Sequence, residues 1–164
     1  TSSLTASSRC SRHGASSRMP SVPTDLTPGD GQDLFARFKR AWEKRDPDAM
    51  LELYSTDAEY RIDPFMEPMT GLNAIRDHWN SVVAAQDHIE FDAERVWTSG
   101  RTVLGSWHVA LTERATADRV RVRGFSTMEL DDQGRIVRMR EWPVRKVVGI
   151  DSSYKQHTAS EAGE

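Results

Sequence analysis

The second half of the chain alternates between apolar and polar residues, and this pattern constrains the fold more than any other feature. It predicts four strands, over residues 89–97, 102–112, 119–130 and 135–144. Short polar turns separate them, such as Asp131–Gly134, so neighbouring strands should pair as antiparallel hairpins. In the third strand Val120 and Met128 share one face, and Arg121 and Arg123 share the other. The pattern predicts a long antiparallel meander with one buried face.

Helices are predicted ahead of this meander, over residues 31–44, 47–55 and 74–85. The first carries an apolar stripe at helical spacing, made of Leu34, Phe35, Phe38, Ala41 and Trp42. Asp46 and Pro47 supply an N-cap and a first-turn proline for the second. Helices that precede a separate antiparallel sheet indicate an α+β fold, with a pocket between the two layers.

A short strand between the second and third helices ends in a charged pair. Arg61 and Asp63 share one face, and Pro64 ends the ladder because proline has no N–H group. Two interpretations stay open: the pair lines a cavity, or it faces solvent. The Met- and Pro-rich loop that follows holds Phe65 and Met66, and it would be a lid if it folded over a cavity mouth.

Composition separates this domain from two polar ends. Residues 1–30 contain three large aliphatic residues, so they are predicted to be a disordered leader before a domain at 31–150. Residues 151–164 are predicted to be a flexible tail. The slight positive charge of the leader leaves a transit peptide open, and Met19 is a second possible start.

Charge and cysteine content exclude several classes of function. The net charge of −3 gives no general attraction to nucleic acid, and one cysteine, Cys10, allows neither a disulfide nor a zinc site. No apolar run approaches the roughly 20 residues that span a bilayer. The sequence therefore predicts a cytoplasmic protein with no membrane and no nucleic-acid partner.

Four segments together resemble a known superfamily. They are the turn Lys44–Ala49, the segment Leu53–Ala58, the helix start Gly71–Ile75, and the turn Leu130–Ile136 before a last strand that ends at Trp142. This arrangement resembles the nuclear-transport-factor-2-like superfamily, and within it the SnoaL-like polyketide cyclase group. The resemblance implies a cone-shaped α+β barrel, with three N-terminal helices packed on a curved antiparallel sheet.

Members of this superfamily differ in the residues that line their pockets. Ketosteroid isomerases carry a general base in an Asp-Pro pair, which Asp63 and Pro64 match, but Phe38 and Ser126 stand at their oxyanion-hole positions. Limonene-epoxide hydrolases use an Arg-x-Asp pair and a further Asp, and His108, Ala110 and Glu141 stand at those positions. The SnoaL-like pattern of an acid and a pocket histidine is matched by His108 with Asp63 or Glu141.

Four residues are the candidates for catalysis: Asp63, His108, Glu141 and Arg61. Each has a structural alternative: a turn cap for Asp63, a strand histidine for His108, a cross-strand pair for Glu141 and a rim charge for Arg61. The predicted substrate-binding wall contains Phe38, Trp42, Tyr60, Phe65, Met66, Trp79, Ser126, Met128 and Met139. The sequence contains no phosphate-binding glycine loop, nucleophile elbow or clustered metal ligands, so no cofactor and no metal are predicted.

The sequence thus favours a cyclase- or isomerase-like enzyme that performs acid/base chemistry on a hydrophobic carbonyl compound. Two alternatives stay open: a non-catalytic ligand-binding or dimerisation module, and an epoxide hydrolase. The arginine-bearing outer sheet face is predicted to form a homodimer, with Phe125 and Trp142 as anchors.

Overall fold

The computed structural model describes residues 24–154, and the leader predicted at 1–30 lies mostly outside them. Helix α1 (Pro28–Glu43) begins three residues earlier than predicted. Thr27 caps it, accepting a hydrogen bond from the Asp30 N–H at 3.3 Å while the Thr27 N–H donates to the Asp30 carboxylate at 2.7 Å. This capping box explains why the helix includes residues that composition assigned to the leader.

Two shorter stretches of helix complete the helical layer. Helix α2 (Pro47–Leu51) is capped by Asp46, whose carboxylate accepts the Ala49 N–H at 2.9 Å. Strand β1 (Tyr54–Arg61) and the two-residue strand β2 (Met69–Thr70) follow, and then helix α3 (Gly71–Ala85). Helix α2 is shorter than predicted because the chain enters β1 at Tyr54, and α3 starts three residues before its predicted start.

The remaining strands form the predicted meander, but the strand predicted over 135–144 ends at Glu141, and a separate strand begins at Val144. They are β3 (Gln86–Ser99), β4 (Thr102–Glu113), β5 (Asp118–Leu130), β6 (Ile136–Glu141) and β7 (Val144–Ile150). The sheet order is β2-β1-β6-β5-β4-β3, and β7 pairs with β5 beyond the end of β6. Strands β1 and β6 pair in parallel, so the sheet is mixed rather than wholly antiparallel.

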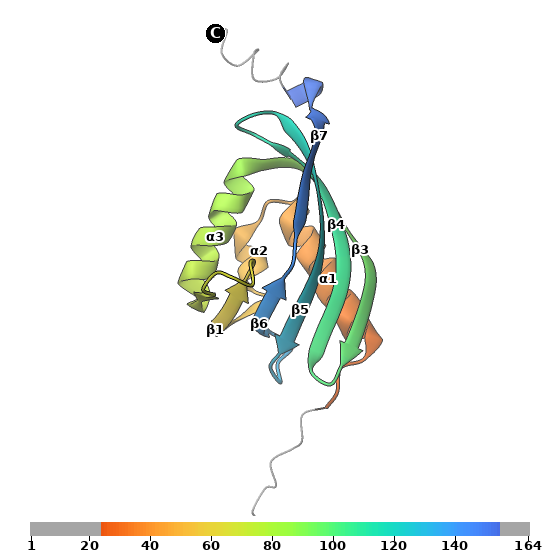
Figure 1. The fold of residues 1–164 in the computed structure, drawn as a ribbon. Coiled ribbons are helices and arrows are strands. Elements are labelled where there is room, and N and C mark those ends of the chain that lie inside the picture. Colours follow the sequence, from red (N-terminus) through yellow and green to blue (C-terminus); the bar gives the residue numbers. More distant parts are fainter. Residues whose placement is uncertain (1–23, 155–164) are drawn as a thin grey trace, which may run out of the picture.

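The helices cover one face of the strongly curved sheet, as Figure 1 shows. Register shifts in β3 and at the β5–β6 pair are the kind of irregularity that increases the twist and curvature of a sheet. The predicted α+β barrel is therefore confirmed.

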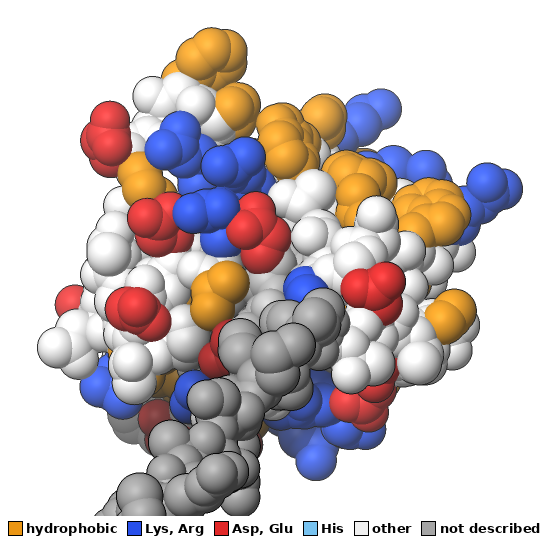
Figure 2. Space-filling view, turned by 90° about the horizontal axis from the view of Figure 1, so that it is seen from below, with side chains coloured by type: hydrophobic (Ala, Val, Ile, Leu, Met, Phe, Trp, Pro, Cys, Tyr) orange, Lys and Arg blue, Asp and Glu red, His pale blue; other side chains and the backbone are white. Residues whose placement is uncertain are grey.

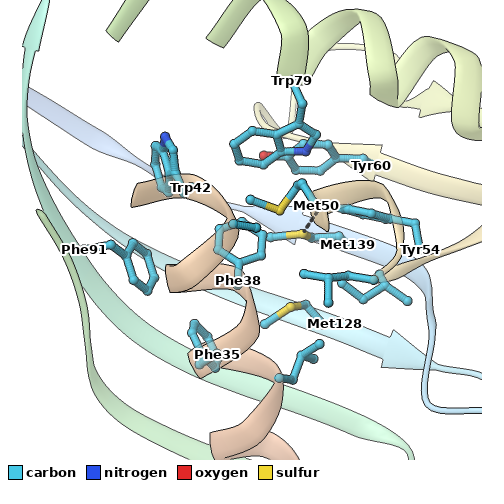
Figure 3. Close-up of a cluster of buried hydrophobic side chains, with 14 of the residues drawn as sticks. Phe35, Phe38, Trp42, Met50, Tyr54, Tyr60, Trp79, Phe91, Met128 and Met139 are labelled. Carbon is cyan, nitrogen blue, oxygen red and sulfur yellow. Dashed lines mark hydrogen bonds between the residues drawn. The ribbon is translucent and has the colours of Figure 1, made fainter. Parts of the chain in front are cut away.

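An aromatic core fills the space between the two layers (Figure 3). The ring centroids of Phe38 and Trp79 lie 5.5 Å apart edge to face, and Trp42 and Phe91 are 5.6 Å apart. Such contacts hold α1 and α3 against the concave side of the sheet. The apolar stripe predicted for the first helix is confirmed as core, since all five of its residues are buried.

The chain beyond β7 is anchored to the sheet. The Asp151 carboxylate accepts hydrogen bonds from Thr112 at 2.7 Å and from Ser153 at 2.6 Å, and it pairs with His88 at 2.8 Å. These bonds hold the first residues of the tail predicted at 151–164 at the end of the meander. No helix within residues 24–154 is long and apolar enough to cross a membrane.

Candidate active site

Glu141 is a charged side chain in the buried interior. It ends β6, pairs in register with Ser126 of β5, and leaves 8% of its surface exposed. Met139, two residues earlier, points the same way and is also buried. The side chain of Glu141 therefore points into the interior.

A chain of hydrogen bonds fixes the Glu141 carboxylate. The Tyr60 hydroxyl donates to Oε2 at 2.8 Å, and the Ser126 hydroxyl donates to Oε1 at 3.2 Å. The Trp107 indole N–H donates to the Ser126 oxygen at 2.6 Å. Because an indole N–H can only donate, this bond leaves the one proton of Ser126 free to point at Glu141. Side chains from β1 and β5 thus meet at one carboxylate on β6, and Trp107 of β4 holds one of them in place.

Gly124 makes room for the indole of Trp107. It lies directly opposite Trp107 in the β4–β5 ladder, and a Cβ at this position would stand 2.2 Å from an indole carbon. That separation is far inside van der Waals contact, so only glycine lets the indole lie across β5. The glycine therefore makes the bond from Trp107 to Ser126 possible.

The environment of Glu141 favours its neutral form. Burial raises the pKa of its carboxyl from 4.5 to about 7, although the hydrogen bonds from Tyr60 and Ser126 act in the opposite direction. No cation within residues 24–154 forms an ion pair with it. The same burial and the nearby carboxylate raise the pKa of Tyr60, which therefore stays protonated and remains a donor. A carboxyl group with a pKa near neutrality can both take and give a proton at pH 7.

A cavity of about 230 Å³ opens beside this carboxylate. Its aromatic walls are Trp42, Tyr60, Trp79 and Trp107, and its aliphatic walls are Ile62, Val82, Leu111 and Val122. The polar lining consists of His78, Gln86, Glu141 and Arg145. A mostly apolar concave site with a few polar groups is the usual form of a small-molecule site.

The aromatic walls hold the cavity in shape. The rings of Tyr60 and Trp79 stack nearly parallel, with centroids 6.3 Å apart, as Figure 3 shows. Trp42 meets Trp107 edge to face at 6.4 Å, and its indole N–H donates to the Gln86 side-chain oxygen at 2.9 Å. The walls are therefore built from large, packed side chains.

The structure distributes the predicted wall residues over three environments. Trp42, Tyr60 and Trp79 line the cavity. Ser126 lies behind Glu141 as its hydrogen-bond partner. The remaining buried residues, Phe38, Met128 and Met139, pack in the core rather than on the cavity wall.

The loop after β1 does not bring its predicted residues into the cavity. Asp63 caps a turn, because its carboxylate accepts the Phe65 N–H at 2.8 Å. The Arg61 guanidinium donates to the Pro64 carbonyl at 3.3 Å. Phe65 and Met66 leave 95% and 66% of their surfaces exposed, and neither lines the cavity. The strand ends at Arg61, so the alternation assumed through Asp63 stops two residues early.

His108 lies on the convex face of the sheet. Its neighbours Trp107 and Val109 are buried, whereas its imidazole lies beside Glu94, 3.4 Å from the carboxylate, and 4.0 Å from the carboxylate of Asp92. The structure therefore does not bring together Asp63, His108 and Glu141, the three groups that the sequence placed in one cavity.

Sequence reasoning missed three residues of this site. They are Trp107, which lines the cavity, Gly124, which makes room for its indole, and His78. The glycine opposite an aromatic residue in a predicted hairpin was an available signal for the close approach. Within residues 24–154, no three His, Cys, Asp or Glu side chains gather closely enough to hold a metal ion.

The fold and this pocket define the class of the protein as a cone-shaped α+β barrel with an open, mostly apolar pocket. The sequence matches the SnoaL-like domain family over residues 35–139, so the chain belongs to that family. No curated protein matches the sequence significantly.

Several solved structures share this fold. One is SalBIII, an epoxide hydrolase/cyclase-like enzyme with a role in pyran ring formation in the polyether salinomycin. It is 20% identical with a TM-score of 0.66, and the match covers 73% of this chain and 97% of SalBIII. A putative isomerase from Bacillus subtilis is 22% identical (TM-score 0.65, coverage 73% and 90%). An LEH-like epoxide hydrolase from M. tuberculosis is 20% identical (TM-score 0.60, coverage 71% and 84%). At these identities the likeness shows a common fold.

Proposed function

We propose that the protein is an enzyme that uses Glu141, without a cofactor, to move a proton on a small apolar carbonyl compound in the aromatic pocket. The observation that carries this proposal is the buried Glu141 carboxyl, whose pKa is raised to about 7 at the wall of an apolar cavity. Cyclisation and isomerisation of such compounds both start with removal of a proton from the carbon beside the carbonyl. A base near neutral pKa is suited to this step.

The ionised carboxyl of Glu141 takes the proton, the C–H electron pair forms the new double bond, and the carbonyl oxygen becomes an enolate oxygen. The neutral carboxyl of Glu141 then returns the proton to another carbon, which gives an isomer. Alternatively, the enolate carbon attacks a second carbonyl of the same molecule, and the proton goes to the new alkoxide, which gives a ring.

Tyr60 and Ser126 serve this step by positioning the carboxylate. Their hydroxyl groups hold one oxygen each, so the carboxylate keeps a single orientation at the cavity wall. Asp63, His108 and Arg61 have no part in this mechanism, because the structure holds them in a turn or on the convex face.

The test is hydrogen exchange at the α-carbons of 2-tetralone, a bicyclic ketone, followed by NMR in D₂O. The wild-type protein should accelerate exchange, and Glu141→Gln should slow it by about 10²-fold or more, since glutamine cannot take the proton. Tyr60→Phe should give an intermediate rate. Asp63→Asn and His108→Gln serve as matched controls, and both should exchange like the wild type. Equal rates for the wild type and Glu141→Gln, or loss of exchange in either control, would contradict the proposal.

The two alternatives have less support. Epoxide hydrolysis by Asp63, His108 and Glu141 requires a common water, and these three groups lie apart. A non-catalytic binding module would bind 2-tetralone in both the wild type and Glu141→Gln without exchange in either. The exchange experiment therefore also separates a binding module from an enzyme.

The proposal includes a homodimer through the convex sheet face. Trp97, Phe125 and Trp142 form an aromatic row there, with successive ring centroids 6.4 and 6.3 Å apart, and both tryptophans are exposed. Figure 2 shows hydrophobic side chains at the surface, interspersed with Lys and Arg. Acidic neighbours neutralise some of the arginines on this face, as in the pair Arg138–Glu129 at 2.9 Å. Exposed aromatics with a charged rim are typical of such an interface.

A further inference from the structure

His78 is a partly buried polar residue of the pocket. Its ring lies edge-on to the Tyr60 ring, with centroids 5.4 Å apart, and 5.5 Å from the Trp79 ring. It lines the same cavity as Glu141, and it makes no hydrogen bond or ion pair with any residue of 24–154. Burial lowers the pKa of its imidazole, which is therefore neutral at physiological pH.

Most other polar groups of the lining are already engaged; among the described residues the exception is the buried indole N–H of Trp79, which can only donate. Tyr60 donates to Glu141, the side-chain oxygen of Gln86 accepts from Trp42, and Arg145 pairs with Glu113 at the cavity mouth. The two other histidines in the described part of the chain also have acidic neighbours: His88 pairs with Asp151, and His108 lies beside Glu94. The imidazole of His78 is only partly buried, so a ligand that displaces water from it must offer a hydrogen bond in return.

We propose that His78 hydrogen-bonds an oxygen substituent on the ligand of this pocket, and that the ligand is a small ring system with one hydroxyl or carbonyl group at that side. The proposal rests on the aromatic pocket being the ligand site of the proposed function. A neutral imidazole offers one N–H donor and one acceptor nitrogen, so it can bond either kind of oxygen.

The cavity limits the size of this ligand. Its volume of about 230 Å³ is below the roughly 300–1,000 Å³ of pockets for drug-sized ligands, so it suits one or two rings. The aromatic walls supply flat apolar surfaces for such rings. His78 thereby acts as a specificity residue, because it strengthens the binding of an otherwise apolar ligand that carries one polar atom.

The experiment compares the binding of 2-naphthol and 2-methylnaphthalene by titration calorimetry. The two probes have the same ring system, and only 2-naphthol can bond to an imidazole. The ratio of their dissociation constants is measured for the wild type, His78→Phe and the matched control His108→Phe. In the wild type and the control, the preference for 2-naphthol over 2-methylnaphthalene should be about 5- to 10-fold larger than in His78→Phe, which has lost one hydrogen bond.

A ring-nitrogen signal gives an independent check. In protein labelled with ¹⁵N-histidine, 2-naphthol should shift the His78 ring resonances, and 2-methylnaphthalene should shift them much less. His78→Leu also removes the hydrogen bond, and it replaces His78→Phe if circular dichroism shows that the latter does not fold.

Three outcomes would overturn the proposal. They are an unchanged ratio in the His78 variant, a preference that disappears in Glu141→Gln but survives in the His78 variant, and a failure of both probes to bind. A protein that has this ligand site but lacks the proposed enzymatic activity gives a different result. The protein would then bind 2-naphthol through His78, yet exchange no 2-tetralone protons.

Discussion

Replacing Glu141 with glutamine should change how the free energy of unfolding depends on pH. The folded pKa is about 7, and the ordinary value is 4.5. Below pH 4.5 both folded and unfolded chains hold the proton, so the group has no effect. As the pH rises from 4.5 to 7, the unfolded chain releases the proton while the folded chain still holds it. The folded state therefore loses stability, by about 3 kcal/mol once the pH exceeds 7.

Urea unfolding at a series of pH values measures this effect. The stability of Glu141→Gln minus that of the wild type should increase by about 3 kcal/mol between pH 4 and pH 8, because glutamine does not ionise. Glu67→Gln, in the exposed loop between β1 and β2, is the matched control and should leave the pH dependence of the wild type unchanged. If the difference in free energy of unfolding between Glu141→Gln and the wild type stays constant within about 1 kcal/mol over this pH range, the assignment of Glu141 as a buried carboxyl without a cationic partner is refuted.

Three other predictions follow from particular contacts. Gly124→Ala should destabilise the protein by about 1–3 kcal/mol and shift the fluorescence of Trp107, because the new methyl group overlaps the indole; unchanged melting and fluorescence would contradict this. Phe125→Glu should convert a dimer to a monomer in analytical ultracentrifugation, and a wild type that is monomeric at all concentrations would exclude the interface. Asp151→Ala should accelerate amide hydrogen exchange in β7, whereas exchange as slow as in the wild type would show that the anchor does not hold this strand.

The alternation of apolar and polar residues predicted the meander because one face of the sheet is buried. Successive side chains of a strand point to opposite faces, and this rule placed Val120 and Met128 on one face, where both are buried. The same rule contradicts the predicted role of His108. Trp107 and Val109 are apolar and buried, so the residue between them belongs to the other face.

The rest of the site depends on contacts between distant elements. His78 follows Ile75 by three residues and precedes Val82 by four, so its place on the inner side of α3 was visible in the pattern. Its approach to Tyr60 was not, because it depends on how α3 rotates against β1. The structure does not place Asp63 in the cavity for a local reason. The chain leaves the strand at Arg61, and the aspartate caps the turn that follows.

The carbon-13 NMR titration of the glutamate side-chain carboxyls tests the central claim most directly. In protein labelled with ¹³C-glutamate, the resonance that disappears in Glu141→Gln identifies Glu141. The structure predicts that this resonance titrates with a midpoint of about 7. A midpoint near 4.5 would show that the carboxyl is ordinary and solvated, and it would contradict the assignment of Glu141 as the proton-transferring group of the pocket.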